Sequence, residues 1–482
     1  AENLPCIIIE SFCCGRPVLS NSVNGVVELI NETNGLMSAP RDIEAFSKNI
    51  CHIIENAGKY DLEKIAINAQ SLFYPEVVGK LIYETYRKTL SVKPAREYQM
   101  CSHCIMDTND DPDISFDANG VCNYCKMYER FSKEIIHRDS LGKKQMLEII
   151  NKIKDKGKNK KYDSILGVSG GVDSTYTAYL AKQYGLRPLL VHLDNGWNSE
   201  LAMSNIEYVV SKLGFDLHTW VINWEEFKDI QLSFLKASVV DIELVTDYAI
   251  VASLYLMAAK HKIDYIITGH NFATEGIMPM NWVHWKSDLL NIESIHNRYG
   301  KEKISTFPQM GYFRKAAYVN LYGIRTFPIL NFANYNKDEA KAIVVNELGW
   351  RDYGGKHNES LFTKFYQSYI LPKKFNIDKR KAHLSTLICS GQTTKEKALA
   401  EMKNPPFVED KIAEDKKYII KKFDLTDAEF EKIMNTPIRQ HTDFPSYAKI
   451  HYKYELMILG KLKPLSKPLK KYFGLRGRTN YV

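Results

Sequence analysis

A short glycine turn between a strand and a helix constrains this chain more than any other feature. Residues 164–168 form a mostly apolar run that predicts a buried strand, and residues 174–184 keep an apolar face at helical spacing. Between them stands Ser169-Gly170-Gly171-Val172-Asp173-Ser174. Two adjacent glycines let the backbone approach a ligand closely, and the N-terminus of the next helix favours negative charge. The stretch therefore predicts an anion-binding loop.

The side chains of this loop suit a nucleotide. Ser169 and Ser174 offer hydroxyl donors, and Asp173 can hold a magnesium ion through one carboxylate. An ordinary glycine turn is the alternative, but the whole string is more specific than two glycines. It resembles the pyrophosphate-binding loop of the PP-loop ATP pyrophosphatases, which cleave ATP between the α- and β-phosphates and adenylate a carbonyl or amide oxygen. Because the loop lacks the Gly-Lys-Ser/Thr ending of a Walker A motif, γ-phosphate transfer is not expected.

Composition and charge agree with a nucleotide-binding protein of several domains. The 482 residues predict roughly three domains, and 45% hydrophobic with 25% charged residues is ordinary globular composition. The net charge of +8 sits on scattered lysines, so it fits small anions at least as well as nucleic acid, and nucleic acid is not the expected partner.

No membrane span and no secretory signal are predicted, which favours the cytoplasm. The chain begins at Ala1 without an initiator methionine, as a fragment or a processed or recombined product would.

Residues 1–90 form a partial Rossmann-like segment. They predict a helix over 5–15 closed by Gly15, a strand, and amphipathic helices over 40–56 and 60–71. The segment resembles the C-terminal part of a two-Rossmann-domain nucleotide-sugar glycosyltransferase of the family 4 kind. The matching residues are Glu2 and Glu10 with seven residues between them, Gly15-Arg16-Pro17-Val18, Gly25-Val26-Val27-Glu28 and Asn34-Gly35-Leu36. Since an acceptor-binding domain and half of the donor domain are lacking, we expect a remnant or fusion partner without transferase activity of its own.

Four cysteines follow a linker over 91–99. Cys101 and Cys104 form one C-x2-C pair, and Cys122 and Cys125 form a second pair seventeen residues later. This spacing predicts a four-thiolate zinc knuckle over 100–130, with a structural ion because no coordination position stays open. Four unliganded core cysteines and an iron-sulfur centre are the alternatives. With nine cysteines in all, the pattern favours metal ligation in a reducing compartment over disulfides.

Strands and helices alternate after the loop. A charged helix over 126–160 leads into the loop strand, and further strands are predicted over 186–194, 217–222 and 264–271, with helices over 200–213 and 249–261. This order predicts an α/β fold with a doubly wound parallel sheet over 131–345, of the PP-loop or adenine nucleotide α-hydrolase-like kind, followed by a mainly helical region over 346–482 that completes the substrate site. Ligands bind at the carboxyl ends of such strands.

Several polar residues stand at those strand ends. Asp194 and Gly196 follow the second strand, and Gly269 and His270 follow the fourth. The PP-loop resemblance implies that the second strand end meets the adenosine and that the Gly-His pair closes over the phosphates. Glu275 is the carboxylate we pair with Asp173 on magnesium. A histidine buried in the core is the competing interpretation of His270.

Two later stretches are candidates for the substrate. Trp282, His284 and Trp285 lie in an aromatic segment, where two tryptophans three residues apart would share a helix face, either as core packing or as a sugar-stacking platform. Gly354-Gly355-Lys356-His357-Asn358-Glu359-Ser360 is a glycine turn opening a helix, with Lys356 suited to a leaving pyrophosphate. Arg380 belongs to a cation-rich run. A solvated charged face is the alternative for the last two stretches.

Together, residues 98–440 resemble the N-acetyl sugar amidotransferases of bacterial lipopolysaccharide O-antigen and flagellin-glycan biosynthesis. The resemblance implies an enzyme that uses ATP and Mg²⁺ to convert the acetamido group of a nucleotide-linked sugar to acetamidino. ATP would adenylate the amide oxygen, ammonia would attack, and Asp173, Lys356 and His270 would serve catalysis. The chain shows no glutaminase domain with a Cys-His pair, so the ammonia would come from a glutaminase partner.

Two rival functions stay open at this stage. A tRNA-thiolating PP-loop enzyme would need cysteines near the nucleotide site, yet Cys389 is the one cysteine after residue 125. A non-catalytic zinc-knuckle protein that keeps an ATP-binding fold belongs to another class, and co-purifying RNA without AMP release would favour it.

Overall fold

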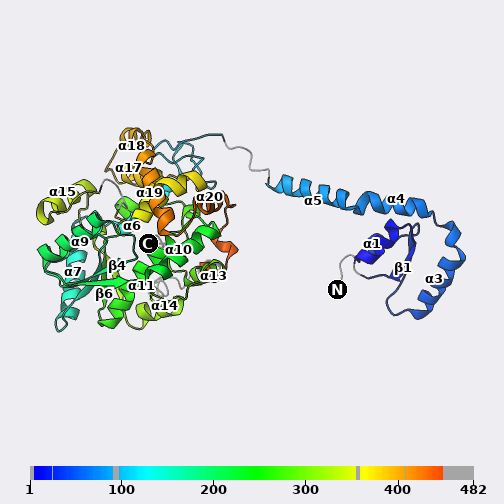
Figure 1. Cartoon of the computed structure of the whole chain (residues 1–482), viewed down its shortest axis with the longest axis horizontal. Helices are drawn as coiled ribbons and strands as arrows, with labels where there is room; N and C mark the ends of the chain where they lie inside the picture. The colour runs from blue at the N-terminus through cyan, green and yellow to red at the C-terminus, as the bar shows by residue number, and fades with distance from the viewer. Residues whose placement is uncertain (1–4, 24, 91–96, 354–358, 408, 449–482) are drawn as a thin grey trace. The chain divides into compact units, whose positions relative to one another are not determined.

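The structure divides into two compact units, Ala1–Glu97 and Tyr98–Val482. It is a computed structural model that describes residues 5–23, 25–90, 97–353, 359–407 and 409–448 (Figure 1). Along these residues, no helix combines the length and the apolar character that crossing a membrane requires.

The first unit is a small α/β segment. Its elements are α1 (Cys6–Cys13), β1 (Val18–Asn21), α2 (Val26–Leu29), β2 (Gly35–Ser38), α3 (Ile43–Glu55), η1 (Ala57–Lys59), α4 (Leu62–Phe73) and α5 (Pro75–Leu90). The two strands pair in parallel, with Val18 opposite Gly35. Gly15, at φ +68°, follows α1 as the predicted glycine closure. Phe12 and Ile65 belong to a small core of their own.

The second unit begins with the cysteine-rich segment and the sheet. Its elements up to the last strand are α6 (Asn123–Ile135), α7 (Ser140–Gly157), β3 (Ser164–Gly167), α8 (Val172–Gln183), β4 (Pro188–Asp194), α9 (Glu200–Leu213), β5 (Leu217–Val221), α10 (Trp224–Ala237), α11 (Leu244–Lys260), β6 (Tyr265–Thr268), α12 (Phe272–Glu275), η2 (Met280–Trp282), α13 (Leu289–Tyr299), α14 (Tyr312–Asn320) and β7 (Arg325–Pro328).

The rest of this unit is helical where it is described. It comprises η3 (Ile329–Asn331), α15 (Lys337–Leu348), α16 (Leu361–Phe365), the π-helical η4 (Tyr366–Phe375), α17 (Lys379–Cys389), α18 (Lys395–Met402), α19 (Glu409–Lys422), α20 (Asp427–Asn435) and η5 (His441–Asp443).

Five parallel strands form the sheet, in the order β5-β4-β3-β6-β7. The predicted α/β fold with a parallel sheet is confirmed. Helices cover both faces, because alternate residues of one strand enter different cores. Ile165 packs with residues of α10 and α11, whereas its neighbour Leu166 packs with residues of α7, α8 and α15. Strand β3 lies at the centre of the sheet, between β4 and β6.

Two local predictions are wrong. The charged helix expected over 126–160 is split into α6 and α7, because Asp139 caps a new helix by accepting a hydrogen bond from the backbone N–H of Gly142. Trp282 and Trp285 do not share a helix face, since the helical turn η2 ends at Trp282. The edge strand β7 was not predicted from the sequence, because half of its four residues are exposed and it lacks an apolar run.

Candidate functional site

The loop between β3 and α8 bends sharply over a neighbouring helix. Gly170 has φ +81°, and a Cβ atom there would lie 2.6 Å from the carbonyl oxygen of Ala202. Only glycine fits both constraints. The Ser174 hydroxyl accepts a hydrogen bond from the Ser169 N–H at 3.3 Å and donates one to the Gly171 carbonyl at 3.1 Å. The loop is thus held in shape by its own serines, with the N-terminus of α8 beside it.

A buried tryptophan fixes the loop from outside. The indole Nε1 of Trp350 donates a hydrogen bond of 2.8 Å to the carbonyl oxygen of Gly170, and the side chain is only 2% exposed. This residue follows α15, 180 positions along the chain. The contact ties the loop to the segment that follows α15 and holds the Gly170 carbonyl in place.

The loop opens into a cavity of about 670 Å³ at the carboxyl ends of the strands. Nine of the predicted site residues line it: Ser169, Gly171, Asp173, Ser174, Gly269, His270, Glu275, His284 and Glu359. Gly269 comes close to the start of α8, since a Cβ atom there would lie 3.0 Å from the backbone of Asp173. The strand ends therefore converge as the parallel sheet predicts.

Six other predicted residues lie outside the cavity lining among the described residues: Gly170, Asp194, Gly196, Trp282, Trp285 and Arg380. Asp194 instead organises a turn by accepting hydrogen bonds from the Gly196 N–H and the Asn198 amide. The residues that line the cavity here are His192 of β4 and, in the turn after it, Asn195 and Asn198. Lys356 and His357 fall outside the described residues.

Three of these six residues have structural contacts that explain their positions. Trp282 is 1% exposed and donates its Nε1–H to the Asp110 carbonyl at 2.9 Å, which is core packing. Trp285 packs edge-on against Tyr312. Arg380 forms an ion pair with Asp378 at 2.6 Å.

One part of the cavity is apolar and suits a flat base. Its walls there are Val191, Leu193, Ile250, Val251 and Leu254, from β4 and α11. Ligand pockets are commonly built this way, with a few polar groups fixing the ligand's orientation. His192, beside these residues, has its pKa lowered by burial, and its Nδ1 lies 2.9 Å from the carbonyl oxygen of Val168. The ring is therefore neutral at physiological pH.

Carboxylates lie close to two tyrosines beside the loop, the buried Tyr335 and the half-buried Tyr353. The Tyr335 hydroxyl donates a hydrogen bond to Asp173. Burial raises the pKa of Tyr335, and the charges of Asp173 and Glu275 raise it further. Burial and the charges of Glu359 and Asp173 likewise raise the pKa of Tyr353. Asp173 and Glu275 thus act on the same phenol, and this pair could hold a magnesium ion.

The far wall of the cavity carries lysines that are tied to carboxylates. Lys379 lies 2.8 Å from Glu243, and Lys286 lies 2.7 Å from Asp241 and 2.8 Å from Asp247. Although burial lowers the pKa of Lys286, the two aspartates outweigh it, and the net shift is upward. All three acidic residues come from the segment at the start of α11. Of these residues the two lysines, Glu243 and Asp247 line the cavity, so their charges balance.

His284 belongs to the same wall. Its Nε2 lies 2.9 Å from Oδ2 of Asp288, and its ring stacks on His441 with centroids 4.4 Å apart and planes within 9°. Its backbone N–H donates to Asp241 at 2.7 Å. The ring is therefore fixed in position by three neighbours and lines the cavity.

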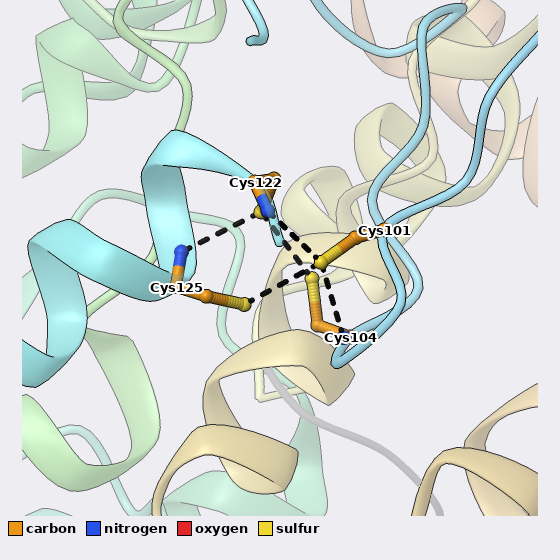
Figure 2. A group of neighbouring side chains, drawn as sticks. All are labelled: Cys101, Cys104, Cys122 and Cys125. Carbon is orange, nitrogen blue, oxygen red and sulfur yellow. Dashed lines mark hydrogen bonds between the residues drawn. The ribbon is translucent and has the colours of Figure 1, made fainter. Parts of the chain in front are cut away.

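The four cysteines of the two C-x2-C pairs meet at the start of α6. Figure 2 shows their sulfur atoms turned toward one another, with Cys101 and Cys104 on the preceding loop. The sulfur atoms of Cys101 and Cys125 are 3.8 Å apart, and those of Cys104 and Cys122 are 3.7 Å apart. Thiolates bound to one zinc ion at about 2.3 Å stand about 3.8 Å apart. All four are buried, so this set could hold a metal ion.

The cysteine cluster also supports the cavity wall. Helix α17 packs on it: the Ile105 N–H lies 3.4 Å from the Ser385 hydroxyl, and Lys381 pairs with Asp107 at 2.6 Å. The same helix brings Lys379 and His383 to the cavity. A distortion of the cluster would therefore reach the far wall through α17.

Two parts of the chain match models of known families. Residues 359–457 match the model described as LPS biosynthesis protein WbpG-like, C-terminal domain. Residues 1–56 match the model of group 1 glycosyl transferases, which confirms the resemblance expected for residues 1–90 over that part. A search of curated proteins gave no match.

Solved structures with some similarity include two synthetases. An NH3-dependent NAD synthetase from Campylobacter jejuni is 17% identical, with a TM-score of 0.23, over 42% of this chain and 83% of that one. An NMN synthetase from Francisella tularensis is 16% identical, with a TM-score of 0.24, over 46% of this chain and 91% of that one.

Proposed function

We propose that this chain is an AMP-forming amidotransferase that converts the N-acetyl group of a nucleotide-linked sugar to acetamidino in bacterial surface-glycan biosynthesis. The observation that carries the proposal is the shared cavity. One side is the Ser-Gly-Gly-Val-Asp-Ser loop, and the other includes residues of the WbpG-like segment: Glu359, Ser360, Thr363, Gln367, Lys379 and His383. The description of that family, LPS biosynthesis, supports a sugar as the second substrate.

ATP would lie along the strand ends. The apolar wall around Leu193 would hold the adenine, and the loop amides with Ser169 and Ser174 would bind the phosphates. Asp173 and Glu275 would hold magnesium, which supplies charge neutralisation at the phosphates when bound. His270 and Lys356, the latter outside the described residues, would stabilise the leaving pyrophosphate.

The chemistry has two steps. The amide oxygen of the acetamido group attacks the α-phosphorus, and the bond to the β-phosphate oxygen breaks to release pyrophosphate. Ammonia then forms a bond to the activated carbon, and the carbon–oxygen bond breaks with its electron pair leaving on AMP. The cavity residues contribute by aligning the amide and by excluding water. Water would otherwise attack the activated carbon and regenerate the acetamido group.

The sugar would occupy the wall formed by Glu243, Asp247, Lys286 and Lys379. Glu243 and Asp247 can accept hydrogen bonds from hydroxyl groups, and Gln367 and Thr363 can donate or accept. Glu359 lies between this wall and the loop. Trp282, 1% exposed, and Trp285, packed on Tyr312, are assigned to packing rather than to sugar stacking.

Zinc and a separate ammonia source complete the proposal. Sulfur atoms within 4.8 Å of one another suit a single ion better than a cluster, whose own iron and sulfide atoms would separate the thiolates. Ammonia would come from a glutaminase partner in the cytoplasm. Residues 1–90 are given no role in the reaction.

Product analysis tests the proposal. The protein is incubated with ATP, Mg²⁺, ammonium and a panel of N-acetylated nucleotide sugars, while AMP and pyrophosphate are followed. We expect one sugar to exchange oxygen for NH in its mass spectrum, with an equal amount of AMP. Unchanged sugars with AMP release stimulated by tRNA would support an RNA-modifying enzyme instead, and RNA binding without AMP release would support a binding protein.

A further inference from the structure

His284 has a fixed tautomer. Its Nε2 lies 2.9 Å from Oδ2 of Asp288, a residue with no exposed surface. Burial raises the pKa of Asp288, but hydrogen bonds from His284, Ser446 and the Tyr447 N–H outweigh it and lower the pKa. The carboxylate is therefore ionised and can only accept. Nε2 must carry the hydrogen, which leaves the lone pair of the neutral ring on Nδ1.

Nδ1 belongs to a ring that lines the cavity. Among the described residues no group bonds to Nδ1, and this nitrogen is not one of the buried side-chain atoms that lack a partner. It is consequently accessible, on a ring whose side chain is 8% exposed and which lines the cavity. The stacked ring of His441 keeps the imidazole from turning.

Two carboxylates and a second histidine surround the ring. Asp288 on α13 bonds to it directly, and Asp241, which accepts the His284 backbone N–H, is ionised and paired with Lys286. His441 on η5 is neutral, because burial lowers its pKa to about 3. An imidazolium at His284 would thus face a carboxylate on one edge and an uncharged ring on its face.

We infer that His284 is the general base of the ammonia step and that Asp288 is its positioning residue. The inference rests on the proposed function. After ammonia adds to the activated carbon, the new nitrogen carries three hydrogens and a positive charge. Nδ1 accepts one of these protons, and the nitrogen lone pair then forms the carbon–nitrogen double bond as the carbon–oxygen pair leaves with AMP. The imidazolium returns its proton to water.

The test separates the two half-reactions. Substrate-dependent exchange of labelled pyrophosphate into ATP measures adenylation, and mass spectrometry measures amidine formation. For His284→Asn we expect exchange within about threefold of the wild type, while amidine formation falls by on the order of 100- to 10,000-fold. Imidazole added to His284→Gly should restore part of the second rate only.

His296→Asn is the matched control, because His296 makes the same 2.9 Å contact from Nε2 to a carboxylate, that of Asp229, but does not line the cavity. It should leave the ratio of the two rates unchanged. A parallel loss of exchange and amidine formation in His284→Asn, or no loss in either, would overturn the role as base. If the wild type shows no exchange with any acetamido sugar, the proposed function fails, and the inference fails with it.

Discussion

The hydroxyl of Tyr335 donates a hydrogen bond to Oδ1 of Asp173, the carboxylate of the glycine loop, from 162 positions further along the chain. Tyr335 is 1% exposed, and burial together with the charges of Asp173 and Glu275 raises its pKa. The phenol therefore stays protonated wherever the protein is folded. It restrains the carboxylate that we propose as a magnesium ligand.

We expect Tyr335→Phe and Asp173→Asn to be coupled in stability. A hydrogen bond to a charged group is worth about 1.5–3 kcal/mol, so Tyr335→Phe should lower the free energy of unfolding by that amount in the wild type and by less in Asp173→Asn. Urea unfolding followed by tryptophan fluorescence reports the second unit alone, since all six tryptophans lie there. Tyr176→Phe, on a ring beside Tyr335, should show no coupling. If the two substitutions lower the free energy of unfolding by strictly additive amounts, the hydrogen bond between Tyr335 and Asp173 is contradicted.

Asp173→Asn should abolish AMP formation, with a fall of on the order of 1000-fold, because the amide neither holds magnesium well nor neutralises its charge. Zinc content and far-UV circular dichroism should not change. Asp216→Asn is the control. This carboxylate lies just before β5, at the amino ends of the strands and so away from the loop. It pairs with Lys161 at the surface. Turnover that survives in Asp173→Asn would refute the metal assignment.

Trp350→Phe should raise the KM for ATP by about tenfold, because the loop carbonyl of Gly170 loses its 2.8 Å donor. The chain offers a matched variant. Trp282 is equally buried and also donates its indole N–H to a backbone carbonyl, that of Asp110 at 2.9 Å. Trp282→Phe should cost similar stability, about 1–3 kcal/mol, without changing either KM. A raised KM for the sugar in Trp282→Phe would instead favour the stacking platform.

The sequence was sufficient for the parts of the site that depend on local spacing. The loop, its flanking strand and helix, and the Gly269-His270 turn all follow from short patterns, and the parallel sheet brings them together. The two cysteine pairs are another local pattern. In each case the residues of one pattern are close together in the sequence, so the pattern can be recognised without the structure. The fold then brings the separate patterns together in space.

The residues that hold those parts in place were not predicted from the sequence. Tyr335 and Trp350 contact the loop from more than a hundred positions away, and each lies in a segment with no distinctive spacing. The aromatic spacing did not decide between core packing and sugar stacking for Trp282, because that choice depends on the direction of the side chain. Asp194 was placed at the correct strand end, yet its carboxylate turns back onto Gly196.

Because His441 is buried, we expect the protein to become less stable in mild acid. Its pKa is lowered to about 3 by burial, whereas the unfolded chain takes up the proton near pH 6.5. The stabilisation is complete above about pH 6.5 and is lost as the pH falls toward 3, by about 1.4 kcal/mol per unit. His441→Asn should be less stable at pH 7.5 but should show a shallower fall in unfolding free energy between pH 6.5 and 5. Equal slopes would show that His441 is protonated in the folded protein.

Loss of metal from the cysteine cluster should reach the substrate site. We expect about one zinc ion per chain by elemental analysis and no visible absorption from an iron-sulfur centre. Cys122→Ser should lose the zinc and lower the melting temperature, and it should raise the KM for the sugar more than that for ATP, because α17 connects the cluster to Lys379 and His383. Cys389→Ser is the control, since Cys389 lies 3.6 Å from the Cys125 sulfur but outside the set of four, and it should retain the zinc. If Cys122→Ser keeps its zinc, or loses it without a change in either KM, the cluster does not support the far wall.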